Sequence, residues 1–259
     1  MISISDTQIN ALIAGFVWPF SRIVALFMAD PLFSTRVVPR RFKAGLALVL
    51  TVLLVPILPP MPAVPVVSGA GGIILAQQLL IGFAMGFVMR LVMGAVEFSG
   101  LLMSNQMGLG FAVAFDPLRS AQVPAVSQLL STMTFLLFLG FDGHHVLIGT
   151  LAESFVRLPI GQSVDALTYR HLVEWAGHIF AWGLWLSLPV VTSLLVVNLA
   201  IGVMTRAAPQ FNIFSFGFPL TLFVGFGTLY LVLPLLVPAV EEIYRQGFAF
   251  ILLMLGKKG

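Results

Sequence analysis

The chain has 259 residues, of which 59% are hydrophobic and only 9% are charged. An average soluble domain has roughly 25% charged residues, so the composition argues against a soluble enzyme and indicates an integral membrane protein or a subunit of an apolar assembly. The net charge is +3 without a long run of lysine or arginine, which argues against nucleic-acid binding. The absence of cysteine excludes disulfides, thiolate metal sites and a cysteine nucleophile.

Apolar runs long enough to form membrane helices recur along the chain. They are Ala11–Met28, Ala44–Leu58, Ile73–Met103, Ala125–Phe141, Leu172–Met204 and Gly217–Val240. A bilayer core takes about 20 helical residues. The second run is therefore short. The third and fifth runs exceed one straight crossing, which predicts tilt, breaks or extension beyond the bilayer.

Prolines interrupt several of these runs, at Pro19, Pro56, Pro189 and Pro234. A proline inside a helix frees a carbonyl group and favours a kink. Gly82 and Gly86 form a small-xxx-small pair, which either allows close approach of another helix or only tolerates local packing.

The connections between the runs give an orientation. Arg36, Arg40, Arg41 and Lys43 crowd the first connection, which places it in the cytoplasm by the positive-inside rule. A chain that crossed six times would then carry its C-terminal cations on the outer side, against that rule. Either one long run doubles back, or not every run crosses the membrane.

Two charges lie inside the third apolar run. Arg90 and Glu97 are seven residues apart, so on a helix they share a face two turns apart. This distance is too long for a direct pair, and an unpaired buried charge is costly. We therefore expect each to meet another helix or subunit, with a position facing a channel lumen as the alternative.

A glycine-flanked apolar segment follows, with Met107, Gly108, Leu109, Gly110 and Phe111. The glycines allow a tight turn that brings the apolar side chains into a small space. The segment is either an ordinary interhelical loop or a hydrophobic constriction that closes a pore by packing and dewetting.

No catalytic or metal-binding motif is present. His144 and His145 are adjacent and are expected to point in different directions, and His171 and His178 complete no ligand set. The sequence also lacks a G-x-S-x-G nucleophile motif and a nucleotide fingerprint. We expect neither an enzyme nor a bound cofactor or metal.

A short polar island, Thr205–Asn212, separates the last two long apolar runs. Large apolar side chains, Phe211, Ile213, Phe214 and Phe216, follow or interleave with its polar residues. A solvated cytoplasmic loop needs only polar turn residues and does not expose four such groups. We therefore expect the island to dock into neighbours, with Gln210 and Asn212 forming hydrogen bonds there.

The island also carries a specific string, R-x-x-P-Q-x-N-x-F-x-x-G-F-P. Its members are Arg206, Pro209, Gln210, Asn212, Phe214, Gly217, Phe218 and Pro219. This string resembles the flagellar export-gate family of the FliR type. The resemblance extends to Pro31-Leu32-Phe33, Val38-Pro39-Arg40, the glycine segment with Asp116-Pro117, and a hairpin corner at Asp142-Gly143-His144.

The resemblance implies an all-α membrane fold of long, Pro/Gly-broken helical hairpins, packed into a hetero-oligomeric helical export channel. It implies a non-enzymatic channel subunit of the flagellar type III export gate in the bacterial inner membrane, at the flagellar basal body. FliP-like and FliQ-like subunits would form the channel with it, and an FlhB-like subunit would close round the entrance. Unfolded flagellar proteins would be the cargo.

The resemblance also implies a role for the glycine segment. Met107–Phe111, ended by Asp116 and Pro117, would plug the closed pore. From the residues themselves we expect subunit contacts at Arg90, Glu97, Arg206, Pro209, Gln210, Asn212, Phe214, Gly217 and Pro219.

Two alternative functions stay open. The subunit could serve a virulence-type secretion system, although Phe218-Pro219 after Gly217 resembles the flagellar type. A small-solute secondary transporter would need a midplane site with paired polar groups, for which intramembrane ionisable residues are scarce. We expect one subunit domain over residues 1–259, with parts of about 1–125 and 126–259.

Overall fold

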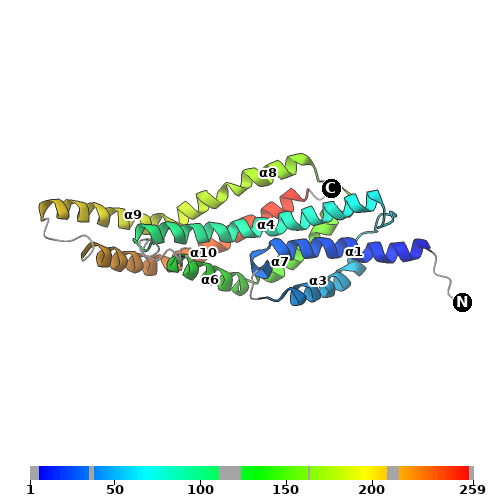
Figure 1. Cartoon of the computed structure of the whole chain (residues 1–259), viewed down its shortest axis with the longest axis horizontal. Coiled ribbons are helices and arrows are strands. Elements are labelled where there is room, and N and C mark those ends of the chain that lie inside the picture. The colour runs from blue at the N-terminus through cyan, green and yellow to red at the C-terminus, as the bar shows by residue number, and fades with distance from the viewer. Residues whose placement is uncertain (1–5, 35–37, 111–123, 163, 209–215, 257–259) are drawn as a thin grey trace. The chain divides into compact units, whose positions relative to one another are not determined.

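The computed structural model describes residues 6–34, 38–110, 124–162, 164–208 and 216–256, and these residues form helices and connections without a strand. The helices are α1 Asp6–Ala29, α2 Pro31–Ser34, α3 Arg40–Leu54, α4 Gly69–Gln106, α6 Ala125–Gly140, α7 Gly143–Arg157, α8 Ala166–Ala176, α9 His178–Ala207 and α10 Phe218–Met254, with a 3-10 turn η1 at Val55–Ile57 (Figure 1). The predicted all-α fold is confirmed.

Helix length exceeds the bilayer in several places. Helix α4 has 38 residues, which is about 57 Å at about 1.5 Å per residue, against a hydrocarbon core of about 30 Å. Four helices are long and apolar enough to cross a membrane, or up to five if the broken pair α6–α7 counts as one span. The run around α3 falls short because that helix has only 15 residues, so the described residues contain fewer candidate spans than the six apolar runs of the sequence.

The prolines inside the long runs do not end their helices. Pro19 lies within α1, Pro189 within α9, and Pro234 within α10. Pro56 differs, because it lies in η1, where α3 ends. Each internal proline removes one backbone donor and leaves a carbonyl that a neighbouring group must satisfy.

The chain divides into two compact units that interleave along the sequence. The first comprises Met1–Leu91, Asp142–Ala176 and Tyr244–Gly259, and the second comprises Val92–Phe141 and Gly177–Ile243. Helices α4 and α10 each contribute to both units. The predicted parts before and after residue 125 stay a prediction.

In the first unit, α4 packs against α1 at the two glycines that the sequence singles out. A Cβ on Gly82 would collide with the carbonyl oxygen of Arg22, and one on Gly86 would lie 2.6 Å from the carbonyl oxygen of Leu26. Of the two interpretations of this pair, the structure supports close helix approach. Helix α3 also contacts α1, and Trp18 is buried in a cluster with Ala14 and Ile74.

In the second unit, α4 packs against α6 and α9. A Cβ on Gly100 would lie 2.5 Å from Cα of Ser127, whose hydroxyl donates to the carbonyl oxygen of Glu97 at 2.6 Å. Phe98 meets Phe180 edge to face, with ring centroids 5.4 Å apart. Small residues thus bring the backbones together, and aromatic pairs fill the space beside them.

Candidate functional site

The predicted plug segment begins where α4 ends. Gly108 adopts a left-handed φ of 82°, which glycine reaches without a Cβ penalty. The N–H of Leu109 donates to the carbonyl oxygen of Ser104 at 3.0 Å, and the N–H of Gly108 donates to that of Asn105 at 3.1 Å. These two bonds form a Schellman motif, so Gly108 is required to end the helix and turn the chain.

Met107, just before the turn, is held within the second unit. Its side chain is fully buried, and Thr221 donates from Oγ1 to the carbonyl oxygen of Met107 at 3.2 Å. A Cβ on Gly225 would lie 2.5 Å from Cε of Met107. The absence of a side chain at Gly225 therefore makes room for Met107, and α10 fixes the base of the segment.

The remaining predicted plug residues lie beyond this base. Leu109 and Gly110 are partly exposed, as expected for a segment that leaves the packed helices. Phe111, Asp116 and Pro117 lie outside the described residues. The structure thus provides an anchored start for the predicted plug.

The predicted contact residues within the described ranges are mostly at the surface. Arg90 and Glu97 are exposed on α4, and Arg206 is exposed in the last turn of α9. Gly217 is buried and Pro219 exposed where α10 begins. The others, Pro209, Gln210, Asn212 and Phe214, lie outside the described residues.

Glu97 has no ion-pair partner among the described residues, and Arg90 approaches only the Ser34 hydroxyl, at 3.5 Å and in an exposed position. Both side chains are therefore accessible to a neighbouring helix or subunit. This fits the expectation that each meets a neighbour.

The sequence patterns did not predict a role for one buried arginine of the first unit. Arg22 on α1 is fully buried. It donates to Oε1 of Gln78 at 2.8 Å, to Oγ of Ser154 at 3.0 Å and to the carbonyl oxygen of Leu158 at 3.0 Å. Its guanidinium lies 4.2 Å from the ring centroid of Phe155. The signal in the sequence was a lone cation inside the first apolar run.

Arg22 therefore ties α1 to α4, α7 and the residue that follows α7. All of the acceptors are neutral, so the guanidinium is stabilised by hydrogen bonds and by the aromatic face instead of by a carboxylate. Contacts from one buried side chain to three separate segments indicate a structural role for the cluster.

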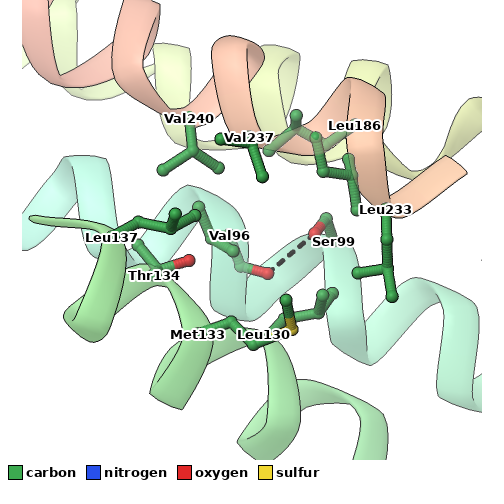
Figure 2. Close-up of a pocket in the computed structure, with 11 residues that line it drawn as sticks. Val96, Ser99, Leu130, Met133, Thr134, Leu137, Leu186, Leu233, Val237 and Val240 are labelled. Carbon is green, nitrogen blue, oxygen red and sulfur yellow. Dashed lines mark hydrogen bonds between the residues drawn. The ribbon is translucent and has the colours of Figure 1, made fainter. Parts of the chain in front are cut away.

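A small apolar cavity lies within the second unit, between α4, α6, α9 and α10 (Figure 2). Its volume is about 20 Å³, whereas small-molecule sites occupy about 300–1,000 Å³. The Ser99 hydroxyl on its wall already donates to the carbonyl oxygen of Val96 at 2.7 Å (Figure 2). This cavity does not have the volume of a solute-binding site.

The adjacent histidines lie close together, contrary to the expectation that they point in different directions. The ring centroids of His144 and His145 are 4.1 Å apart, and both residues follow the turn at Asp142, where φ is 55°. One ligand atom from each of these three residues lies within 4.8 Å of the others. Asp142 and His145 are solvent-exposed and already contact each other at 3.3 Å, as an ordinary surface pair does.

Comparison with known proteins assigns the chain to a family. The family described as bacterial export proteins, family 1, matches residues 13–247. The flagellar biosynthetic protein FliR of Pectobacterium carotovorum subsp. carotovorum is 41% identical over 96% of this chain and 95% of its own length. Those of Escherichia coli (strain K12) and Bacillus subtilis (strain 168) are 38% and 29% identical, over 96% and 90% of this chain and 95% and 91% of their own lengths.

The all-helical structure and the family match together define a non-enzymatic membrane component of a bacterial protein export apparatus. The chain belongs to the FliR family of bacterial export proteins. It is accordingly a component of the flagellar type III export apparatus in the inner membrane, as the string from Arg206 to Pro219 predicts.

Proposed function

We propose that the chain is a channel-forming subunit of the export gate, whose long helices pack against other subunits over a length that lipid cannot cover. The observation that supports this is the exposure of its last two long helical segments. In the most apolar stretch of each segment, 28% of the residues are buried for Leu167–Ala207 and 22% for Phe218–Met254. The corresponding share for Gly69–Gln106 is 61%.

These two segments contain 41 and 37 residues, roughly twice the 20 or so that lipid can cover. Large apolar side chains are exposed along both, including Leu199 and Val203 on α9 and Phe223 and Leu231 on α10. Apolar surface beyond the bilayer needs protein to cover it. A hetero-oligomeric channel supplies such a cover, whereas a solitary transporter does not.

The partners that fit this surface are FliP-like and FliQ-like membrane subunits, with an FlhB-like subunit at the entrance. Unfolded flagellar export substrates would be the cargo. In this arrangement Arg90, Glu97 and Arg206, which are exposed within the chain, contact the neighbouring subunits. Gln210 and Asn212 contribute hydrogen bonds in the same interface.

The plug belongs to the same proposal. Met107 is the fixed base, Gly108 is the turn, and Leu109 to Phe111 close the pore, with Asp116-Pro117 ending the segment. Apolar groups close a pore by packing and by excluding water. The hydrogen bond from Thr221 and the space left by Gly225 support an anchored plug over an ordinary loop.

Purification tests the channel proposal. The tagged chain, extracted in mild detergent, should bring down two different small membrane proteins in unequal number. Recovery of the chain alone or as a small homo-oligomer would contradict it and favour a solute transporter. The double variant Gln210→Ala with Asn212→Ala should lower the yield of this complex, and normal yield with lost export would instead indicate a contact with cargo.

A further inference from the structure

A half-open groove of about 490 Å³ lies in the first unit, between α1 and the start of α3. Contacts between α1 and α3 hold its two walls together. Its lining consists of Phe20, Val24, Phe27 and Met28 from α1, Ser34 from α2, and Arg40, Lys43 and Ala44 from α3.

The lining is apolar along α1 and basic at the start of α3. The α1 wall belongs to Gln8–Ala29, one of the four candidate membrane spans. Arg40 and Lys43 belong to the first turn of α3, and the lining contains no acidic side chain. The groove therefore runs from an apolar wall on a candidate membrane span to a pair of cations.

The start of α3 is unusual for a helix N-terminus. Acidic side chains are favoured there by the helix dipole, yet the first turn holds Arg40, Arg41 and Lys43 and no acid. Pro39, the N-cap residue, supplies no side-chain hydrogen bond. An anion at this end would be attracted both by the cations and by the positive end of the helix dipole.

We propose that this groove binds an anionic phospholipid of the inner leaflet. Its phosphate lies against Arg40 and Lys43, and an acyl chain follows Val24 and Met28 along α1. Basic pockets at the cytoplasmic ends of membrane helices suit anionic head groups, and the strongly basic first connection is cytoplasmic by the positive-inside rule. This site is independent of the channel and plug.

The apolar wall and the two cations both favour a lipid over an acidic protein segment as the occupant of the groove. A peptide in the apolar part of the groove would place backbone N–H and C=O groups against Phe20 and Val24, where no described polar group of the lining can satisfy them. An acyl chain has no such groups. Phosphate oxygens meanwhile accept charge-assisted hydrogen bonds from arginine and lysine at the other end.

Native mass spectrometry of the assembled complex tests the proposal, with phosphatidylglycerol and phosphatidylcholine of identical acyl chains as probes. The wild-type complex should retain phosphatidylglycerol preferentially. Lys43→Gln should lower that preference about fivefold, the effect of one cation near a phosphate. Arg41→Gln is the matched control, because it removes the same charge one position from Arg40 but outside the lining, and should lower the preference less than Lys43→Gln does.

Val24→Phe tests the groove itself, since it fills the apolar part and keeps every charge. It should also reduce phosphatidylglycerol retention. A wild-type complex without preference, an equal loss in Arg41→Gln, or full retention in Val24→Phe would each overturn the proposal.

A photoreactive residue at Met28, whose side chain is 71% exposed, gives a second readout in cells. Crosslinks to phospholipid are expected. Crosslinks to a protein of the apparatus instead would show that another subunit occupies the groove.

Discussion

Thr221 donates a hydrogen bond from Oγ1 to the carbonyl oxygen of Met107, at 3.2 Å and across 114 positions of sequence. The bond is buried, and the single hydroxyl proton is shared with the carbonyl oxygen of Phe218, which lies 2.9 Å away within the same helix. The start of α10 thereby holds the end of α4 at the point where the proposed plug begins.

Thr221→Val keeps the shape of the side chain and removes the donor. A net hydrogen bond is worth about 1 kcal/mol, so the unseated state of Met107 should become more populated by at most about fivefold, because the same proton also serves Phe218. We expect a higher ion leak through the assembled gate, with deletion of Gly108–Ala112 as the upper limit. Leak is measured in cells that express the gate without cargo.

Thr132→Val is the control for this variant, because the Thr132 hydroxyl bonds only within α6, to the carbonyl oxygen of Gln128, and is exposed. It should not raise the leak. The anchored-plug proposal fails if the deletion leaves permeability unchanged. An equal leak in both threonine variants would show that the effect does not come from Met107.

Gly225→Ala and Gly227→Ala should change stability in opposite directions. A Cβ at Gly225 would lie 2.5 Å from Cε of buried Met107, whereas nothing lies within 4 Å of one at Gly227. Overpacking costs about 1–3 kcal/mol, and alanine in an unobstructed helix position gains up to about 1 kcal/mol over glycine. Thermal unfolding in detergent measures both, and a shift of the same sign in both variants would contradict the packing seen here.

Arg22→Lys should destabilise the first unit despite keeping the charge. Lysine cannot reproduce the planar fork that reaches Gln78, Ser154 and Leu158 together. Each acceptor left without a donor costs about 1–3 kcal/mol, so a loss of at least about 2 kcal/mol is expected.

The matched control for this change is Arg90→Lys on the exposed face of α4, for which about 0.5 kcal/mol or less is expected. Resistance to proteolysis in detergent at increasing temperature measures both variants. Equal tolerance at the two positions would rule out a structural role for the Arg22 cluster.

Local patterns in the sequence predicted much of this fold. The apolar runs predicted the long helices. An apolar run longer than one membrane crossing is most simply a continuous or a broken helix. The resemblance to the family also predicted a hairpin corner at Asp142-Gly143-His144. In the structure Asp142 has a positive φ, and α7 begins at the next residue.

The packing partners were not predictable in the same way. Gly82 and Gly86 indicated a possible close approach but not that α1 would be the neighbour. Arg22 and Ser154 are 132 positions apart and Thr221 and Met107 are 114 apart. No periodicity or spacing relates such residues, because their proximity depends on how separate helices pack.

Asp30→Asn should remove a pH dependence of stability. Asp30 lies just beyond the span Gln8–Ala29 and is fully buried. Its Oδ1 accepts from the N–H groups of Leu32 and Phe33, while Oδ2 has no partner among the described residues. Burial raises the pKa of Asp30 from 3.8 to about 7, against the opposing effect of those two N–H groups.

The sign of the effect follows from proton binding. Between about pH 4 and pH 7 the folded protein retains a proton on Asp30 that the unfolded chain has lost, so the free energy of unfolding falls as pH rises and levels off above about 7. Asparagine keeps the acceptor oxygen and cannot ionise, so the slope should disappear. Asp165→Asn, at an exposed carboxyl that accepts the N–H of Leu167, should retain the slope. A slope that persists in Asp30→Asn would show that another group causes it.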